Sequence, residues 1–174
     1  ATAYNKKKHK IFESKGVLNN KISEHIMLLL ASKKIPTHFV KRINDREQMI
    51  KKCEIIPIEF VVRNIASGSI CSRLGIKDGL KLKKPLLEYY LKEDSLDDPI
   101  VSRDHLELFG WATKKEIEKI DRMSLKINHC LINHFKKKGI TLVDFKIEFG
   151  RLSSNKKKIV LADEISPDSC RLWD

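Results

Sequence analysis

Cysteine is scarce in this chain, and its apolar runs are short. The 174 residues include four cysteines, Cys53, Cys71, Cys130 and Cys170, with no CxxC pair and no regular spacing. This scatter excludes a cysteine-based zinc module and a disulfide framework. The longest apolar run, residues 26–31, is far shorter than the roughly 20 residues of a membrane-spanning helix. We therefore expect a reduced, soluble, cytoplasmic protein with no membrane partner.

Arginine is a minority among the basic residues, although the net charge is +12. A strongly basic chain suggests nucleic-acid binding, because lysine and arginine neutralise phosphates and release counterions. Only eight of the 35 basic residues are arginines, however, and nucleic-acid sites favour the planar guanidinium. We therefore favour a solvated lysine-rich surface that attracts small phosphorylated metabolites, with no nucleic-acid partner. A nucleic-acid-binding module stays as an alternative.

Apolar spacing in the first 65 residues predicts a helix followed by strand structure. Residues 20–34 carry isoleucine and leucine at helical spacing, and the pattern stops before Pro36, where a helix is expected to end. Residues 49–65 alternate between apolar and other side chains, as a half-buried strand does. Glu59 and Arg63 would then share one face of that strand.

The middle of the chain predicts an irregular stretch and then a long helix. Residues 66–69 break the preceding strand, and we expect a mostly irregular, functional stretch from there to Pro99. Thr113 and Glu116 have the spacing of a capping box at the start of an apolar stripe. We therefore expect a helix that begins there and ends near Gly139.

The last two expected strands carry charge on one face. Residues 140–149 and 158–163 are predicted to be antiparallel neighbours. Helices and mixed short strands in this order indicate an α+β fold. Alternation along the first strand places Asp144, Lys146 and Glu148 on one face. In an ordinary half-exposed strand this face would simply meet solvent.

Hairpin register offers a second interpretation of the same face. If the turn centres near Asn155, residues whose numbers sum to about 310 lie opposite each other, which brings Asp163 close to Glu148. Two converging carboxylates repel each other, and such a pair suits Mg²⁺ beside substrate phosphates. Lys146, on the same face, would then meet a phosphate or a substrate carboxylate.

The C-terminal tail is dense in groups that bind polar ligands. Ser166-Pro167-Asp168 has the composition of a turn, and turn formation alone would explain it. Arg171 follows directly and offers a planar fork suited to phosphate or carboxylate. The six histidines show no metal-ligand spacing, so we assign them no role.

Several stretches resemble one enzyme family. LVDFKIEFG (142–150) and LADEISPDSCRLWD (161–174) are similar to the two signature motifs of the SAICAR synthetases, the phosphoribosylaminoimidazole-succinocarboxamide synthases. The resemblance spans the chain in order. It also includes IPIEFVVRNIASGS (56–69), Lys15-Gly16, Asn19-Asn20, Asp98-Pro99 and Phe109-Gly110-Trp111.

The resemblance implies a two-lobed α+β fold, related to the ATP-binding architecture of kinases and ATP-grasp enzymes. Residues 1–65 would be the remainder of an N-terminal ATP-binding lobe, and residues 66–174 a C-terminal substrate- and metal-binding lobe of one continuous catalytic domain. The implied reaction is a ligation in purine biosynthesis. ATP phosphorylates the carboxylate of carboxyaminoimidazole ribonucleotide, and the amine of L-aspartate then displaces phosphate, with Mg²⁺ bound and a homodimer as the assembly.

The family's functional residues fall on named positions of this sequence. By resemblance, Glu148 and Asp163 would bind Mg²⁺, and Lys146 would be the catalytic residue in the same polar site. The ribose phosphate of the substrate nucleotide would be bound by Arg63, Ser69 and Arg171, and its ring or sugar by Asp168. Weaker candidates for the ATP or aspartate side are Lys92 and Asp98, and the backbone at Ile55 and Ile56 would face the adenine.

The resemblance is incomplete at both ends. Family members carry an N-terminal strand-loop-strand around the ATP phosphates and a segment beyond Arg-Leu-Trp-Asp, and neither is in this sequence. Asn5 also stands where an acidic residue is common. Because phosphate-binding loops and chain ends are commonly disordered without ligand, we expect the sequence to count only ordered residues. An intact mass near 20.2 kDa would contradict this expectation. A chain truly this short would bind ATP weakly or not at all and would have little ligase activity. A kinase-like phosphotransferase with another acceptor is a further alternative.

Overall fold

The computed structural model describes residues 2–3, 8–9 and 12–174. The expectation about Asn5 lies outside the described residues. A two-stranded ribbon of β1 (Thr2–Ala3) and β2 (Lys8–His9) precedes helix α1 (Lys15–Ser32). Helix α1 confirms the helix expected over residues 20–34, although it begins five residues earlier.

The remaining elements follow along the chain. They are β3 (Phe39–Arg42), β4 (Gln48–Ile50), β5 (Cys53–Ile65), α2 (Ser69–Leu74), β6 (Lys81–Leu91), the 3₁₀ turn η1 (Asp94–Leu96), β7 (Ile100–Val101), α3 (Arg103–Leu108), α4 (Lys114–Lys136), β8 (Thr141–Leu152), β9 (Asn155–Ala162) and β10 (Cys170–Trp173). The mixture confirms the α+β class. The strand structure expected over residues 49–65 is divided between β4 and β5.

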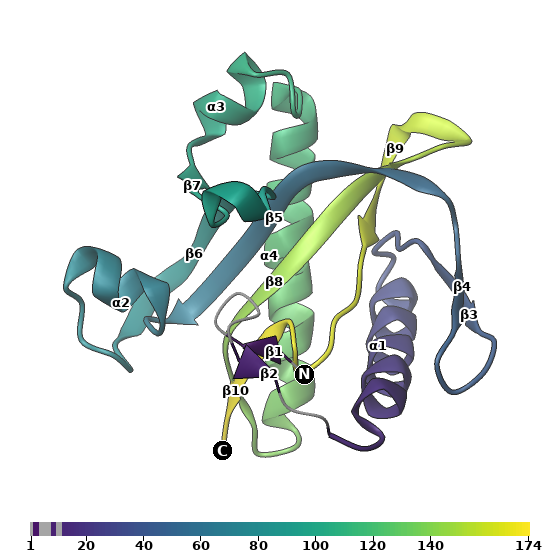
Figure 1. Ribbon diagram of the computed structural model, residues 1–174, viewed down its shortest axis with the longest axis horizontal. Coiled ribbons are helices and arrows are strands. Elements are labelled where there is room, and N and C mark those ends of the chain that lie inside the picture. The colour runs from purple at the N-terminus through teal and green to yellow at the C-terminus, as the bar shows by residue number, and fades with distance from the viewer. Residues whose placement is uncertain (1, 4–7, 10–11) are drawn as a thin grey trace.

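One six-stranded antiparallel sheet organises the chain (Figure 1). Its central strand is β5, which pairs with β8 on one side and with β6 on the other. Strands β10 and β9 share the outer edge of β8, because β10 pairs with its first half and β9 with its second half. The division of the chain at residue 65 stays a prediction, although β5 lies between two strands from the later part of the sequence.

The β8–β9 hairpin has the expected register. Glu148 lies opposite Ala162, Phe149 opposite Leu161, and Gly150 opposite Val160. The turn is tighter than predicted, since β9 already begins at Asn155, and a register shift near the turn absorbs the difference. This register confirms that the end of β9 leads Asp163 toward Glu148.

Strand β6 was wrongly predicted as part of an irregular stretch. It runs for 11 residues and pairs with β5 from Ile58 to Ile65. Pro85 favoured the irregular interpretation, because proline cannot donate to a strand ladder. In the structure Pro85 falls within the register shift between Arg63 and Ile65, where a missing donor is tolerated.

The apolar core lies on one face of the sheet, under α4. Phe60, Phe145 and Phe149 are fully buried there, with Phe149 edge-on to Phe60. Figure 1 shows α4 running behind β5 and β8, so that face is covered by a helix. The charged face lies on the other side. No helix within residues 12–174 is both long and apolar enough to cross a membrane.

Helix α4 is tied to the sheet at its first turn. Thr113 and Glu116 form the expected capping box, each side chain bonding the other residue's backbone N–H. Arg151 of β8 donates from Nε to the Glu116 carboxylate at 2.7 Å. This guanidinium lowers the pKa of Glu116 from its ordinary 4.5 to about 2.

Glu116→Gln should destabilise the protein in a pH-dependent way. Gln keeps the capping geometry, so the loss reports the charge alone, and we expect about 1–3 kcal/mol at pH 7. A carboxylate with a depressed pKa stabilises the fold above its unfolded pKa and loses that effect as the pH falls through its folded pKa. The difference from wild type should therefore shrink from pH 4.5 toward pH 2, as measured by urea unfolding at several pH values.

Glu118→Gln is the matched control on the same helix. Glu118 forms no ion pair with any of the described residues, and we expect it to change stability by less than about 0.5 kcal/mol. A stability difference for Glu116→Gln that stays constant from pH 7 to pH 2.5 would contradict the charge explanation.

Candidate functional site

The charged face of the sheet is built by β5 and β8 together. Residues opposite one another across two strands point to the same face. On this face lie the cross-strand pairs Glu59 with Glu148, Val61 with Lys146, and Arg63 with Asp144. The side chains are not simply solvated, because Arg63 and Glu148 are each 4% exposed and Asp144 is 7% exposed. The interpretation of an ordinary solvent-facing strand is therefore wrong for this face.

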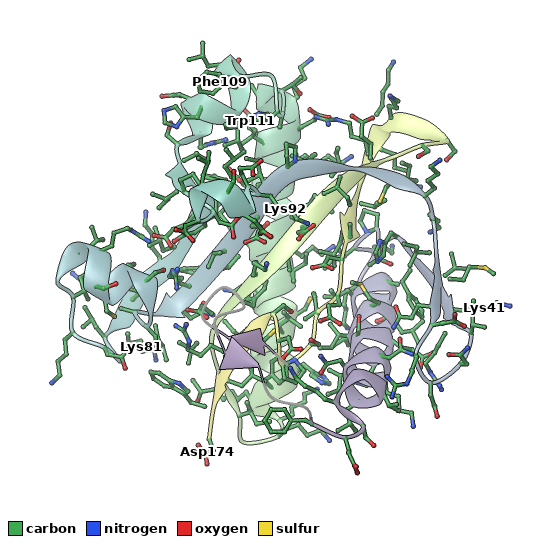
Figure 2. All side chains as sticks on the ribbon, in the orientation of Figure 1. Lys41, Lys81, Lys92, Phe109, Trp111 and Asp174 are labelled. Carbon is green, nitrogen blue, oxygen red and sulfur yellow. The ribbon has the colours of Figure 1, made fainter. Side chains whose placement is uncertain are left out.

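One half of the face is a cluster of carboxylates and lysines. Lys92 Nζ lies 2.6 Å from Glu148 Oε2, and Lys146 pairs with Glu59. Figure 2 shows Lys92 over the sheet, in front of β5 and β8. Asp163 follows β9 directly and is close enough for its charge to act on both Glu148 and Lys146. Glu59 was placed on this face by the sequence but given no role.

Burial and charge shift the pKa values within this cluster. Burial raises the pKa of Glu148, and the neighbouring Asp163 charge raises it further, against the opposing effect of Lys92. Burial on its own lowers the pKa of Lys146, but the hydrogen bond to Glu59 and the nearby carboxylates raise it above its ordinary value. Lys146 therefore stays a cation, while burial and Asp163 disfavour the charged form of Glu148, which an added positive charge would stabilise.

The donor set fits a hard divalent cation that is also bound by a ligand. Residues 12–174 contain no group of three or more His, Cys, Asp or Glu that could hold a metal by themselves. Glu148 and Asp163 are two carboxylates whose repulsion raises the pKa of Glu148. Mg²⁺ typically takes one or two carboxylates and completes its shell with water and phosphate oxygens. The pair therefore suits Mg²⁺ arriving with a phosphorylated substrate.

His38 supports this cluster and was not identified from the sequence. Its side chain donates to the backbone carbonyl of Asp163, and its backbone N–H donates to Leu161 O at 2.8 Å. Burial lowers the pKa of His38, which favours the neutral ring. Asp163 has a left-handed backbone, with φ of 55°, so these contacts help to hold an unfavourable conformation. Nothing in the local sequence around His38 signals a partner 125 residues away.

The other half of the face is a series of alternating arginines and carboxylates. Arg63 donates from Nη1 to Asp144 Oδ2 at 2.8 Å, and Arg171 of β10 donates to the same oxygen at 2.9 Å. Arg63 also donates from Nε to Glu88 Oε2 at 2.7 Å. Burial raises the pKa of Asp144, and both arginines oppose that rise. Glu59 shares this face of β5 with Arg63 but pairs with Lys146.

A cleft of about 330 Å³ opens between the two halves. Four of the predicted residues line it, namely Arg63, Lys146, Asp168 and Arg171. They come from β5, β8, β10 and the loop before β10. That loop is anchored to the part of β8 between its β9 and β10 pairings, where Lys146 N donates to Ser169 O at 2.8 Å.

The loop carrying Asp168 has the predicted turn chemistry and an additional anchor. The Asp168 N–H donates to the Ser166 hydroxyl at 3.1 Å. The Asp168 carboxylate accepts from Lys15 Nζ at 2.5 Å and from Asn19 Nδ2 at 2.7 Å. These bonds lower the pKa of Asp168 although burial opposes them. The motif residues Lys15 and Asn19 thus reach the site from the start of α1.

The other predicted residues lie around the cleft or away from it. Ser69 begins α2, and its hydroxyl accepts from Arg63 Nη2 at 3.1 Å. Asp98 accepts from the Glu93 N–H at 2.9 Å and does not line the cleft. Ile55 and Ile56 lie in the part of β5 before its pairing with β6 begins, and the side chain of Ile56 is fully buried.

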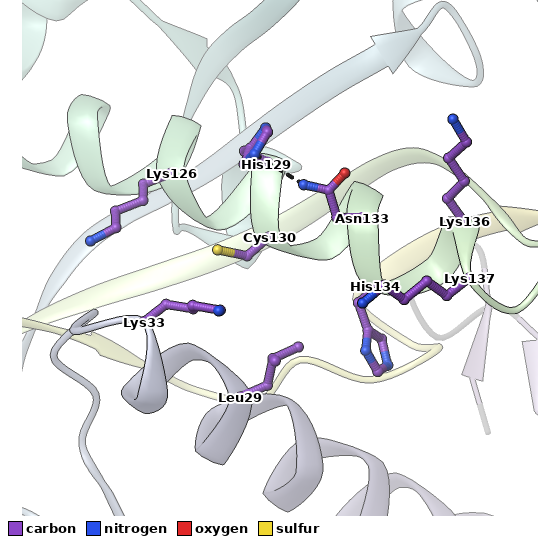
Figure 3. Close-up of a pocket in the computed structure, with 9 residues that line it drawn as sticks. All are labelled: Leu29, Lys33, Lys126, His129, Cys130, Asn133, His134, Lys136 and Lys137. Atoms are coloured by element: carbon purple, nitrogen blue, oxygen red, sulfur yellow. Dashed lines mark hydrogen bonds between the residues drawn. The ribbon is translucent and has the colours of Figure 1, made fainter.

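A larger concavity of about 840 Å³ lies between α1 and α4 and holds none of the predicted residues (Figure 3). It is lined by Lys33, Lys126, Lys136 and Lys137, with His129 and His134, and by no carboxylate. The smaller cleft, where cations and carboxylates converge, is therefore the candidate functional site.

Comparisons with known proteins identify the family of the chain. The family model described as SAICAR synthetase matches residues 1–174. A phosphoribosylaminoimidazole-succinocarboxamide synthase of Pelagibacter ubique is 59% identical over 175 residues, which cover 100% of this chain and 67% of the relative. The same enzyme of Bartonella henselae is 58% identical, with 100% and 69% covered.

Solved structures match over the same range. The phosphoribosylaminoimidazole-succinocarboxamide synthase of Ehrlichia chaffeensis has a TM-score of 0.97 at 51% identity, covering 100% of this chain and 74% of that one. A SAICAR synthetase in complex with ADP has a TM-score of 0.95 at 42% identity, covering 100% and 73%. Together with the family model, these similarities show that the chain belongs to the SAICAR synthetase family of ligases.

Proposed function

We propose that this protein joins L-aspartate to 5-amino-1-(5-phosphoribosyl)imidazole-4-carboxylate, with ATP consumed, to give SAICAR, ADP and phosphate. One observation carries the proposal: a single cleft holds Arg63, Lys146, Asp168 and Arg171 beside the carboxylates of Glu148 and Asp163. The relatives named as synthases of this product support the reaction. The order of bond changes rests on the family resemblance.

The proposed roles follow from the hydrogen-bonding groups and charges that each side chain still has available. Among the described residues Arg171 bonds through one nitrogen, Nη1, to Asp144, so its remaining N–H groups would bind the ribose phosphate. Asp168 lies at the mouth of the same cleft and would accept from the sugar or ring. Lys146, kept cationic by Glu59, would neutralise charge on the reacting carboxylate or phosphate. When bound, Mg²⁺ would offset phosphate charge at Glu148 and Asp163.

The finer features of the enzyme are part of the same proposal. The ADP complex of a related structure supports nucleotide binding, and we place the adenine against the backbone of Ile55 and Ile56, where β5 has no β6 partner. Lys92 would meet ATP or aspartate, while Asp98 would shape its loop. The two-lobed relation to kinases and ATP-grasp enzymes, the cytoplasmic location and the homodimer are proposed from family resemblance alone.

ADP formation by the full-length enzyme tests the proposed function. We expect ADP release to require both aspartate and the carboxylated nucleotide, because the amine must trap an activated carboxylate. A kinase-like phosphotransferase with another acceptor would release ADP without aspartate. ADP formed at the full rate with either substrate omitted would exclude the ligase assignment.

Glu148→Gln and Asp163→Asn should each lower kcat/KM by about 100-fold or more. Each substitution keeps the side-chain volume and removes one metal-binding charge, and an electrostatic contribution of this kind is typically worth that much. The Mg²⁺ concentration for half-maximal rate should rise in both variants, while the unfolding midpoint changes little. Glu107→Gln, an exposed carboxylate on α3, is the control. An unchanged Mg²⁺ dependence in both site variants would rule out the metal assignment.

Gly68→Ala should raise the KM for the nucleotide by about tenfold or more while leaving the KM for ATP near its wild-type value. A Cβ at Gly68 would lie 2.6 Å from Arg171 Nη2, so the guanidinium must move. Gly75→Ala is the control for a positive φ, because Gly75 has a φ of 64° and nothing lies within 4 Å of its added Cβ, although its ψ of 25° differs from the −132° of Gly68. Steady-state kinetics of both variants provide the measurement. Equal changes in the two variants would show that backbone strain, and not Arg171, is responsible.

A further inference from the structure

All five N–H donors of Arg63 bond to other groups of the protein in this structure. Nε donates to Glu88, and Nη1 donates to Asp144 and, at 3.2 Å, to the backbone oxygen of Ser67. Nη2 donates to Ser69 Oγ at 3.1 Å and to Tyr90 Oη at 3.2 Å. A guanidinium carries five N–H groups in a fixed fork. Arg63 therefore acts in this geometry by holding its neighbours.

Glu88 is the group that determines the position of Arg63. It is 7% exposed, and both of its oxygens are occupied. Oε2 accepts from Arg63 and from the Tyr90 hydroxyl at 2.9 Å, and Oε1 accepts from Arg73 of α2. Arg73 also donates to Tyr90 Oη at 2.8 Å. The Glu88 carboxylate and the Tyr90 hydroxyl thus hold Arg63 and Arg73 side by side.

The effect of Glu88 extends through Arg63 to the walls of the cleft. Arg63 fixes the Ser69 hydroxyl on one side and the Asp144 carboxylate on the other. Asp144 in turn holds Arg171, which lines the cleft and retains free donors. Glu88 is absent from the cleft lining, so any effect on a ligand must pass through these neighbours.

We infer that Glu88, assisted by Tyr90, is a positioning residue for recognition of the substrate's phosphate group, acting through Arg63 on Ser69, Asp144 and Arg171. The inference rests on the proposed function, since it concerns the nucleotide site of the ligase. Direct contact of Arg63 with the phosphate stays a prediction, and Glu88 would hold Arg63 in place for it. The cost of leaving a buried guanidinium without its carboxylate is the physical reason for the arrangement.

Glu88→Gln separates positioning from simple electrostatics by the direction of its effect. Removing a negative charge makes the cleft more positive, so charge alone would tighten phosphate binding. Loss of positioning weakens it, and we expect the KM for the nucleotide to rise about tenfold or more, with kcat and the KM values for ATP and aspartate within about twofold of wild type. Inorganic phosphate, used as a competitor of the nucleotide in the full-length enzyme, should show a parallel rise in Ki.

Two further variants guard against a folding defect. Tyr90→Phe removes only the hydroxyl that joins Arg63, Arg73 and Glu88, and should raise the same KM to a smaller extent. Glu116→Gln removes a carboxylate that also pairs with an arginine, but far from the cleft, and should leave every KM unchanged. Circular dichroism and unfolding midpoints establish that each variant is folded.

The outcomes distinguish this inference from the proposed function. A nucleotide KM and phosphate Ki that fall or stay constant in both Glu88→Gln and Tyr90→Phe overturn the positioning role. Equal increases in the KM values of all three substrates overturn it as well, because they indicate general damage. Wild-type enzyme that releases ADP without both co-substrates contradicts the proposed function instead. Calorimetric binding of inorganic phosphate to wild type and Glu88→Gln still tests the positioning role in that case.

Discussion

The structure depends on the pairing of opposite charges on a face of the sheet that is largely closed to water. Arg63 and Asp144 lie opposite each other on β5 and β8, and both are less than a tenth exposed. Buried charges persist only when they are paired and hydrogen-bonded. Because a slip of one residue would turn every side chain of a strand to the other face, the β5–β8 register and the charge pairs require each other.

The same constraint divides the site into two halves with different chemistry. Toward Glu148, carboxylates gather with two lysines, and an incoming cation would relieve the repulsion between Glu148 and Asp163. Toward Asp144, two arginines share one carboxylate oxygen, and Arg171 keeps donors that bond none of the described residues. Under the proposed function, a metal-bound phosphate would lie beside a second phosphate held by arginine.

Sequence patterns failed to predict strand β6 and the partners of Arg63. Strand β6 was missed because Pro85 is a poor strand residue, and only its partner β5 reveals that it lies at a register shift. Glu88 lies on β6 and was missed for the same reason, because no sheet face can be predicted for a residue in an expected loop. Arg63 had Glu59 as its nearest candidate partner along the strand, but β8 supplies Lys146 to Glu59 and Asp144 to Arg63. On this central strand, the charged side chains of Glu59 and Arg63 pair with residues of adjacent strands and not with residues of their own strand.

The sequence by itself determined the periodic features: α1, the capped helix α4, the alternation along β5 and β8, and the hairpin register that leads Asp163 to Glu148. These follow from local geometry, in which two- and 3.6-residue periods and turn chemistry act over a few residues. Only the tertiary structure decided which cation meets which carboxylate, and which arginine keeps free donors. Those choices depend on contacts between residues 15 to 153 positions apart, which no local pattern encodes.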